Sequence, residues 1–223
     1  MADQPSARKR VAVLISGRGS NMAALIAAAK APDYPAEIAL VLSNRPDAAG
    51  LLAARAANIA TAVVDHARFG KDRESFERAV QADLESHRID LVCLAGFLRL
   101  LTPWLVGRWQ WRMLNIHPAL LPAFKGLDTH ERAFAAGVKI HGASVHFVVP
   151  EMDSGPIIAQ VAVPVRDDDD AAALAARVLM GEHQIYPLAL SLVARDRVRI
   201  VDGRCVIDGT KGSAGTLIVP QMR

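Results

Sequence analysis

The chain lacks any apolar run that approaches the ~20 residues a bilayer-spanning helix needs. Its first ten residues are polar, and the apolar stretch Val11–Ile15 is too short to form the core of a signal peptide. Only two cysteines, Cys93 and Cys205, occur among the 223 residues, too few for a disulfide framework. These absences predict a cytoplasmic protein with inert thiols and no membrane partner.

Concentrated basic charge is also missing. The net charge is +3 and the basic residues are scattered, with the densest cluster at Arg8-Lys9-Arg10. Nucleic acid is therefore not an expected partner, whereas a mild positive balance suits anionic small molecules. No zinc-type spacing is found, so no metal is expected. Repeats and linkers are absent too, which predicts one domain over residues 1–223 with loose tails at 1–9 and 209–223.

What the first half does contain is a regular alternation of short apolar runs and longer amphipathic stretches. Strands are predicted at Val11–Ile15, Ile38–Leu42, Ala60–Val64 and Leu91–Leu94, and helices at Asn21–Lys30, Asp47–Ala57 and Arg73–Ser86. Such alternation predicts βαβ units with right-handed crossovers and a mostly parallel sheet. Because the strands are almost continuously apolar, helices are expected on both faces, as in a Rossmann-like α/β domain.

The second half is expected to add antiparallel elements to this α/β domain. Further strands are predicted at Met113–Asn115, Ala143–Val149, Ile157–Val165, Arg197–Val201 and Cys205–Ile207. Asp202-Gly203 predicts a type I′ hairpin turn between the last two. The acidic run Asp167–Asp170 is predicted to cap a helix at Ala171–Leu192, with a metal site as the weaker alternative.

The motif Asn115-Ile116-His117-Pro118 follows the end of a predicted sheet strand, where α/β sheets bind their ligands. Side chains two residues apart in an extended segment leave the same face, and Pro118 favours extended geometry for His117. An amide can stabilise an oxyanion, an imidazole can move a proton, and a carboxylate can tune the imidazole. Asp153, in a later Asp-Ser-Gly-Pro turn, supplies that carboxylate. Each residue alone is more often structural, but together they predict acyl transfer.

The loop Ser16–Asn21 follows the first strand and opens a helix. Its two glycines permit a tight turn, and the free N–H groups at the helix start attract an anion. Met22 stands where a dinucleotide fingerprint has its third glycine, and the second strand does not end on a carboxylate. The loop therefore favours a single phosphate monoester over NAD, with an ordinary capped turn as the alternative.

The segment Leu94–Leu101 continues the fourth strand into a loop that carries one arginine, Arg99. An apolar strand end beside an arginine suits a flat heteroaromatic ligand with a carboxylate tail, and core packing beside a solvated Arg99 is the alternative. His146 shares one face of its predicted strand with Ser144 and Val148, which indicates a supporting role at the site or beneath it.

Six blocks in order across most of the chain resemble the phosphoribosylglycinamide formyltransferases, a branch of the folate-dependent formyltransferases. The blocks are Ser16–Asn21, Leu94–Arg99, Asn115–Pro122, His141–Val148, Asp153–Pro156 and Glu182–Pro187. The Asn-x-His-Pro and Asp-x-Gly-Pro pair is typical of folate formyltransferases broadly. The Ser-Gly-x-Gly-Ser-Asn loop narrows the resemblance to the ribonucleotide enzymes.

The resemblance implies transfer of the formyl group of 10-formyltetrahydrofolate, a co-substrate, to the amine of glycinamide ribonucleotide in purine synthesis. It implies that Asn115 and His117 stabilise the oxyanion while Asp153 holds His117 in its useful protonation state. It places the ribonucleotide at Gly19, Ser20, Asn21 and Glu182, and the folate at Leu98, Arg99, Leu101, Val148 and Met152. The reaction requires no metal, and both a monomer and a homodimer stay open.

Rival readings are weaker. A methionyl-tRNA formyltransferase is expected to carry a sizeable C-terminal β domain, and a formyltetrahydrofolate hydrolase an added N-terminal domain, and the printed sequence has room for neither. A dehydrogenase is disfavoured by Met22 and the missing ribose carboxylate. A binding module without catalysis does not need Asn115, His117 and Asp153 together.

Overall fold

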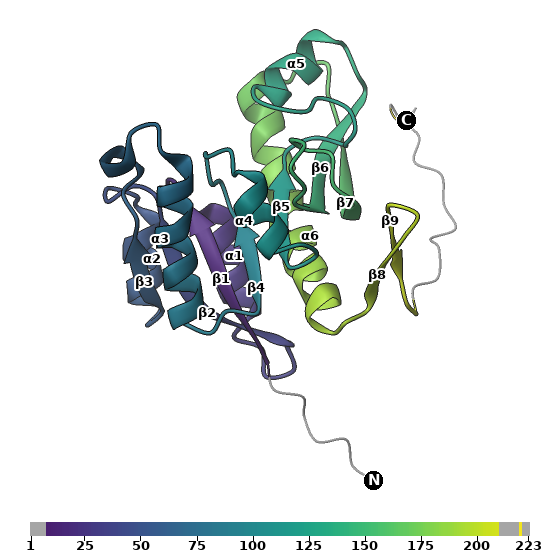
Figure 1. Cartoon of the computed structure of the whole chain (residues 1–223). Helices are drawn as coiled ribbons and strands as arrows, with labels where there is room; N and C mark the ends of the chain where they lie inside the picture. The colour runs from purple at the N-terminus through teal and green to yellow at the C-terminus, as the bar shows by residue number, and fades with distance from the viewer. Residues whose placement is uncertain (1–7, 210–218, 220–223) are drawn as a thin grey trace.

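A seven-stranded sheet in the order β3-β2-β1-β4-β5-β6-β7 forms the centre of the molecule (Figure 1). The computed structural model describes residues 8–209 and residue 219. The strands are β1 (Lys9–Ile15), β2 (Ala36–Ser43), β3 (Ala60–Val63), β4 (Leu91–Leu94), β5 (Met113–His117), β6 (Ile140–Phe147) and β7 (Ile157–Pro164). The first five pair in parallel, whereas β6 is antiparallel to both β5 and β7. The predicted α/β fold with antiparallel additions is confirmed.

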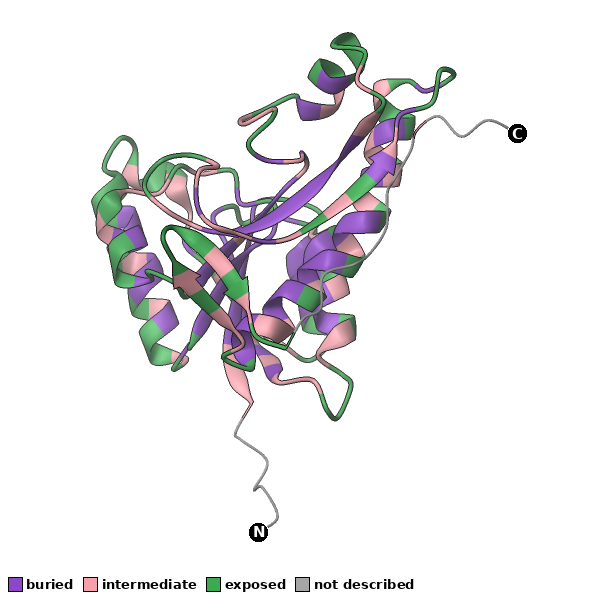
Figure 2. Ribbon diagram, turned by 90° about the vertical axis from the view of Figure 1, so that its right-hand side faces the viewer, coloured by how far each residue is buried: buried purple, intermediate pink, exposed green. Residues whose placement is uncertain are grey.

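Helices cover both faces of this sheet and bury a separate core on each. One face packs against α1 (Ser20–Ala28), α2 (Gly50–Ala56), α5 (Thr129–Ala135) and α6 (Ala171–Ala194), and the other against α3 (Arg73–Ser86) and α4 (Pro103–Arg108). Because alternate residues of a strand face opposite sides, Val11, Val13 and Ile15 enter the first core while Ala12 and Leu14 enter the second. Figure 2 shows the resulting buried interior, with the exposed residues on the outer sides of the helices.

The C-terminal part contains the capped helix and the hairpin that the sequence predicts. Asp170 accepts a hydrogen bond from the N–H of Ala173 at 2.7 Å and so caps α6. The hairpin joins β8 (Val198–Val201) to β9 (Arg204–Ile207), and φ is positive at both Asp202 and Gly203, as a type I′ turn requires. This hairpin forms its own two-stranded sheet (Figure 1), and its residues Val198, Ile200 and Cys205 pack against the core of the central one.

Three short helical elements were not predicted from the sequence: α4, α5 and the 3₁₀ helix η1 (His66–Phe69). Each spans at most 7 residues, too few for a helical period to stand out. Of the tails expected at 1–9 and 209–223, Lys9 already belongs to β1, and residues 1–7, 210–218 and 220–223 lie outside the described part of the chain. None of the helices among the described residues is long and apolar enough to span a bilayer.

Candidate active site

The end of β5 places Asn115 and His117 in the middle of the sheet, between the last parallel neighbour and the first antiparallel one. Asn115 is opposite Leu94 in β4 and opposite His146 in β6, while His117 is opposite Ser144. The sheet therefore changes from parallel to antiparallel at this strand. The change brings a second histidine, His146, directly across from Asn115.

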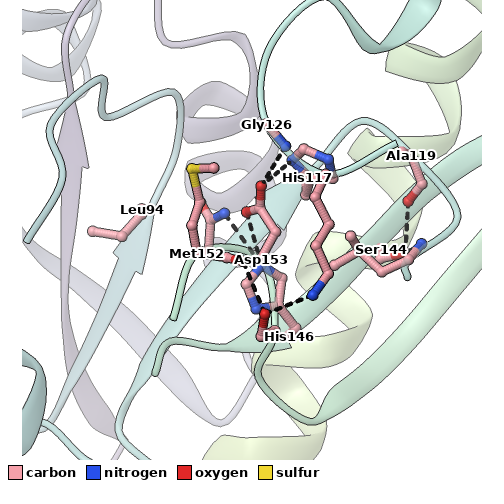
Figure 3. Close-up of polar contacts among 12 residues, drawn as sticks. Leu94, His117, Ala119, Gly126, Ser144, His146, Met152 and Asp153 are labelled. Carbon is pink, nitrogen blue, oxygen red and sulfur yellow. Dashed lines mark hydrogen bonds and ion pairs between the residues drawn. The ribbon is translucent and has the colours of Figure 1, made fainter. Parts of the chain in front are cut away.

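Asp153 reaches this point from the loop between β6 and β7 and lies between two imidazole rings (Figure 3). Its Oδ2 is 3.4 Å from Nδ1 of His117, and its Oδ1 is 3.8 Å from Nε2 of His146. Oδ2 also accepts the N–H of Gly126 at 2.9 Å. The side chains of His117 and Asp153 are 7% and 10% exposed, so the pair is shielded from bulk water.

The tautomer of His117 follows from its second ring nitrogen. Nε2 lies 2.9 Å from the carbonyl oxygen of Phe124, and a carbonyl only accepts, so Nε2 carries a proton. Nδ1 is then the nitrogen that faces Asp153. When it is protonated, the carboxylate of Asp153 at 3.4 Å stabilises the charge, and this distance is long enough for a substrate oxygen to share the Nδ1–H with the carboxylate.

The side-chain amide of Asn115 is oriented by His146, whose tautomer also follows from its backbone contact. Its Nδ1 donates to the carbonyl oxygen of Phe147 at 2.9 Å, which leaves Nε2 as an acceptor for the side-chain N–H of Asn115 at 3.3 Å. Burial lowers the pKa of His146 and keeps the ring neutral, so Nε2 stays an acceptor. One amide N–H of Asn115 is thus engaged, and the other is left for a ligand.

The chain that follows His117 is anchored from β6 by Ser144. Its hydroxyl donates to the carbonyl oxygen of Ala119 at 2.7 Å and accepts the N–H of Leu121 at 3.0 Å (Figure 3). Gln160 on β7 donates to the same hydroxyl at 2.8 Å. Ser144 is fully buried, so the start of the loop after β5 is held firmly against the antiparallel half of the sheet.

The glycine loop after β1 exposes an uncapped helix N-terminus. Gly19 is the residue before α1, with φ 73°, and no side chain caps the helix there. The N–H of Gly50 donates to the carbonyl oxygen of Gly17 at 3.0 Å, so the start of α2 supports the loop from behind. The N–H groups at the start of α1 thus have no side-chain cap, and the phosphate site expected at Ser20 and Asn21 stays a prediction.

Asn21 and Glu182 meet although they lie far apart in the chain. The amide of Asn21 donates to Oε2 of Glu182 at 2.6 Å, and both side chains are buried. Burial raises the pKa of Glu182, and the bond from Asn21 lowers it in part. The side-chain oxygen of Asn21 has no hydrogen-bond partner among the described residues. Two acceptor groups therefore lie side by side, which suits a ligand rich in N–H or O–H donors.

A single hydroxyl joins the glycine loop to the segment after β4. Ser16 donates to the side-chain oxygen of Asn44 at 2.6 Å and accepts the N–H of Leu98 at 2.8 Å. Its own N–H donates to the carbonyl oxygen of Gly96 at 3.0 Å. The segment with the predicted folate residues Leu98, Arg99 and Leu101 is thus held against the start of the anion loop.

The predicted folate residues lie on two segments. Leu98 is 73% exposed and Met152 is 52% exposed, although both are large and apolar, whereas Leu101 and Val148 pack in part against the core under α3 and α4. Met152 lies near Gly126 and directly precedes Asp153, so its segment borders the catalytic groups. Exposed apolar side chains beside buried polar groups are typical of a binding surface for a partly apolar ligand.

Two further histidines, His130 and His141, pack beneath the loop that follows β5. The rings of His130 and His141 meet edge to face with centroids 5.4 Å apart, and Phe124 contacts His141 in the same way at 5.8 Å. Burial lowers the pKa of His141 to about 4, so its ring is neutral near pH 7. His130 thus belongs to the packing beneath the loop that contacts His117.

Sequence reasoning also missed the backbone groups of Phe124 and Gly126, because a backbone carbonyl or N–H leaves no mark in the residue types. His146 was assigned only a supporting role. Its pairing with Asn115 required the register of β6 against β5. In residues 8–209 no group of three or more histidine, cysteine or acidic side chains is arranged to hold a metal ion.

Residues 9–190 match the model of the formyl transferase family. The chain belongs to the formyl transferase family. This match covers β1 to most of α6 and includes Asn115, His117, Asp153 and Glu182.

Relatives within the formyl transferase family have two architectures. The phosphoribosylglycinamide formyltransferase of Escherichia coli is 42% identical over 90% of this chain and 94% of its own length. The human trifunctional purine biosynthetic protein adenosine-3 is 48% identical over 86% of this chain, which spans only 19% of that protein. The crystal structure of glycinamide ribonucleotide transformylase 1 from Symbiobacterium toebii matches with a TM-score of 0.87 and 42% identity, over 90% of this chain and 94% of that one.

Proposed function

We propose that this formyl transferase moves the formyl group of 10-formyltetrahydrofolate to the primary amine of glycinamide ribonucleotide, a step of purine synthesis. The observation that carries the proposal is the meeting of Asn115, His117 and Asp153 at the end of β5. Relatives of the full length of this chain that are named for the same reaction support it.

In the proposed reaction the amine nitrogen attacks the formyl carbon, and the carbonyl oxygen becomes an oxyanion. The free N–H of Asn115 and the Nδ1–H of protonated His117 converge on that oxygen and stabilise it. Asp153 balances the imidazolium and, through water, takes up the proton that the attacking amine releases. The bond from carbon to N10 then breaks, and N10 receives that proton. The amine is itself the nucleophile, so no serine or cysteine has to be activated.

In this proposal the ribonucleotide binds beside α1 and α6, which cover one face of the sheet, whereas Leu101 and Val148 of the folate site pack against the core on the other face. The ribonucleotide phosphate binds the N–H groups of Ser20 and Asn21 beyond Gly19, where the helix terminus attracts negative charge. The two acceptors at Asn21 and Glu182 receive donor groups from the ribose and glycinamide part. The folate lies along Leu98 to Leu101, Val148 and Met152, with Arg99 available to its carboxylates.

The test is a formyl-transfer assay on the purified chain with both substrates and no added metal, with Asp153→Asn as the matched inactive variant. Formylation of the amine that requires both substrates supports the proposal. Release of formate without the ribonucleotide, at a rate that the ribonucleotide does not change, indicates a hydrolase instead. Absence of both products from folded protein contradicts formyl chemistry altogether.

A further inference from the structure

The short segment 124–127 lies between the catalytic residues and helix α5, and its backbone groups alternate between the two. The carbonyl oxygen of Phe124 accepts from Nε2 of His117, and the N–H of Gly126 donates to Oδ2 of Asp153. The carbonyl oxygens of Lys125 and Leu127 turn the other way. This segment therefore sets the second contact of both His117 and Asp153.

On the side away from His117 and Asp153, segment 124–127 is held by the side chain of Arg132. Nη1 of Arg132, on α5, donates to the carbonyl oxygens of Lys125 at 2.7 Å and Leu127 at 3.2 Å. Its guanidinium also lies over the ring of Phe124, 5.7 Å from the centroid. Arg132 thus contacts three of the four residues in 124–127 and holds the two carbonyl groups that do not face the site.

We propose that Arg132 is a positioning residue for catalysis, which fixes the tautomer of His117 and the placement of Asp153 through segment 124–127. The inference rests on the proposed formyl transfer for its effect on turnover, but its effect on His117 does not depend on any activity. Arg132 does not touch the reacting groups. It acts by keeping the carbonyl of Phe124 aimed at Nε2, so that Nδ1 stays the working nitrogen.

Segment 124–127 and the residue after it have an unfavourable backbone conformation that depends on the contacts around it. Phe124, Asp128 and Gly126 have positive φ, a conformation that costs energy for the two residues with a side chain. Such a backbone persists only where its surroundings fix it. Apart from the contacts with His117 and Asp153 themselves, two further contacts support the segment: the ring of His141 meets that of Phe124 at 5.8 Å between centroids, and the ammonium of Lys125 donates to the hydroxyl of Ser154 at 2.7 Å. Loss of Arg132 leaves these contacts, so the chain is expected to fold while the carbonyl of Phe124 loses its fixed direction.

The experiment compares Arg132→Met with Arg112→Met. Arg112 makes the same kinds of contact far from the site, because its guanidinium donates to the carbonyl oxygen of Arg108 at 2.7 Å and lies 4.7 Å from the ring centroid of Trp109. We expect Arg132→Met to lower kcat roughly 10- to 100-fold, since small misplacements of catalytic groups have effects of that size. KM for both substrates is expected to stay within about twofold. Arg112→Met is expected to match the unchanged chain.

The tautomer of His117 distinguishes a positioning role from a purely structural one, because a loss of stability alone does not change it. Nitrogen NMR of labelled imidazoles, recorded without substrates, is expected to show the Nε2–H form in the unchanged chain and in Arg112→Met. Arg132→Met is expected to show a mixture of both tautomers. Arg132→Lys keeps the charge but not the planar fork, and is expected to fall between the two. If circular dichroism shows that Arg132→Met is unfolded, Arg132→Lys is measured in its place.

Two results overturn the proposal. One is a folded Arg132 variant with the turnover and the His117 tautomer of Arg112→Met. The other is a variant that loses turnover while the tautomer is unchanged, because Arg132 then acts by another route. If the unchanged chain shows no formyl transfer at all, the proposed function fails, and the tautomer measurement alone still decides whether Arg132 positions His117.

Discussion

The two sides of the site are built in different ways. The side proposed for the ribonucleotide lies at the parallel half of the sheet and consists of a strand-to-helix turn, the backbone N–H groups of α1, and one bond between Asn21 and Glu182. The catalytic side belongs to the antiparallel half, where Asn115 and His117 on β5 meet His146 on β6 and Asp153 from a loop. One side depends on main-chain geometry, and the other depends on side-chain chemistry.

The difference teaches where each side is vulnerable. A site made of backbone N–H groups tolerates side-chain changes but not changes that move the backbone. A site made of paired rings and a carboxylate keeps its shape when one atom is exchanged, yet loses its chemistry. Substitutions on the ribonucleotide side should therefore change KM, and substitutions on the catalytic side should change kcat.

The largest effect is expected from Asp153→Asn. The neutral amide cannot balance a charged His117 or take up a proton, and general acid–base contributions amount to about 10²–10⁴-fold. We expect kcat to fall within that range while circular dichroism is unchanged. Asp65→Asn is the matched control, because Asp65 also accepts a backbone N–H, at 3.0 Å from Ala67, but lies in the parallel half. Near-normal turnover of a folded Asp153→Asn would remove this residue from the mechanism.

Gly19→Val should weaken binding on the proposed ribonucleotide side. A side chain there meets Met22 at 3.1 Å and must adopt φ 73°, which a β-branched residue strongly disfavours. We expect KM for the ribonucleotide to rise about 100-fold, while calorimetry still detects a folate analogue. Gly137→Val controls for backbone strain alone, since Gly137 also has positive φ, at 66°, with open space around it. Equal loss of both ligands would contradict the separation of the two sides.

His146→Phe tests the indirect part of the catalytic side. The substitution removes the acceptor for Asn115 but keeps a flat ring in a buried position. Asn115 is then free to turn away from the oxyanion, and we expect kcat to fall about tenfold, less than for Asp153→Asn. Steady-state kinetics with both substrates near saturation decide this. An unchanged kcat would mean that the amide of Asn115 needs no second partner.

The smallest effect is a shift in stability, expected from Glu182→Gln. Burial raises the pKa of Glu182 in the folded state. Ionising this group above the ordinary glutamate pKa of 4.5 therefore lowers the free energy of unfolding. Stability from this group is full below that pH and is lost as pH rises through the higher folded pKa. The neutral variant should therefore be the more stable one at pH 7.5 and show no advantage at pH 4. Thermal unfolding at the two pH values, beside ribonucleotide titration, should show a stabilised chain with weakened binding. A lower melting temperature at pH 7.5 would contradict the assignment.

The sequence predicted the parallel half of the fold closely because each of its parts has a local signal. Arg73–Ser86 and Leu91–Leu94 were predicted with the bounds that the structure shows, since apolar periodicity and turns mark both ends. The short helices α4 and α5 were not predicted because they contain too few residues to show a helical period of apolar side chains. Met113–Asn115 was predicted two residues short of the strand, which continues to His117.

The candidate site was predictable as a set of residue types but not as a geometry. Asn115 and His117 share a face because of their spacing, and this follows from the sequence alone. Their contacts do not, because the ring of His146 comes from strand register and the partners at Phe124 and Gly126 are backbone groups. The contact of Nε2 with the carbonyl of Phe124 decides which nitrogen of His117 faces the substrate. The roles assigned to these residues stay predictions until the variants are measured.

The bond between Asn21 and Glu182 also has a consequence for how the protein is made. The two residues are 161 positions apart. At 5–20 residues per second, a ribosome needs about 8–30 s after adding Asn21 before it adds Glu182. During that interval the nascent chain already contains the whole glycine loop, but not the carboxylate that completes the pocket. If the ribonucleotide binds where we propose, tight binding begins only when α6 has been synthesised and docked, and ligand retention then marks a finished molecule.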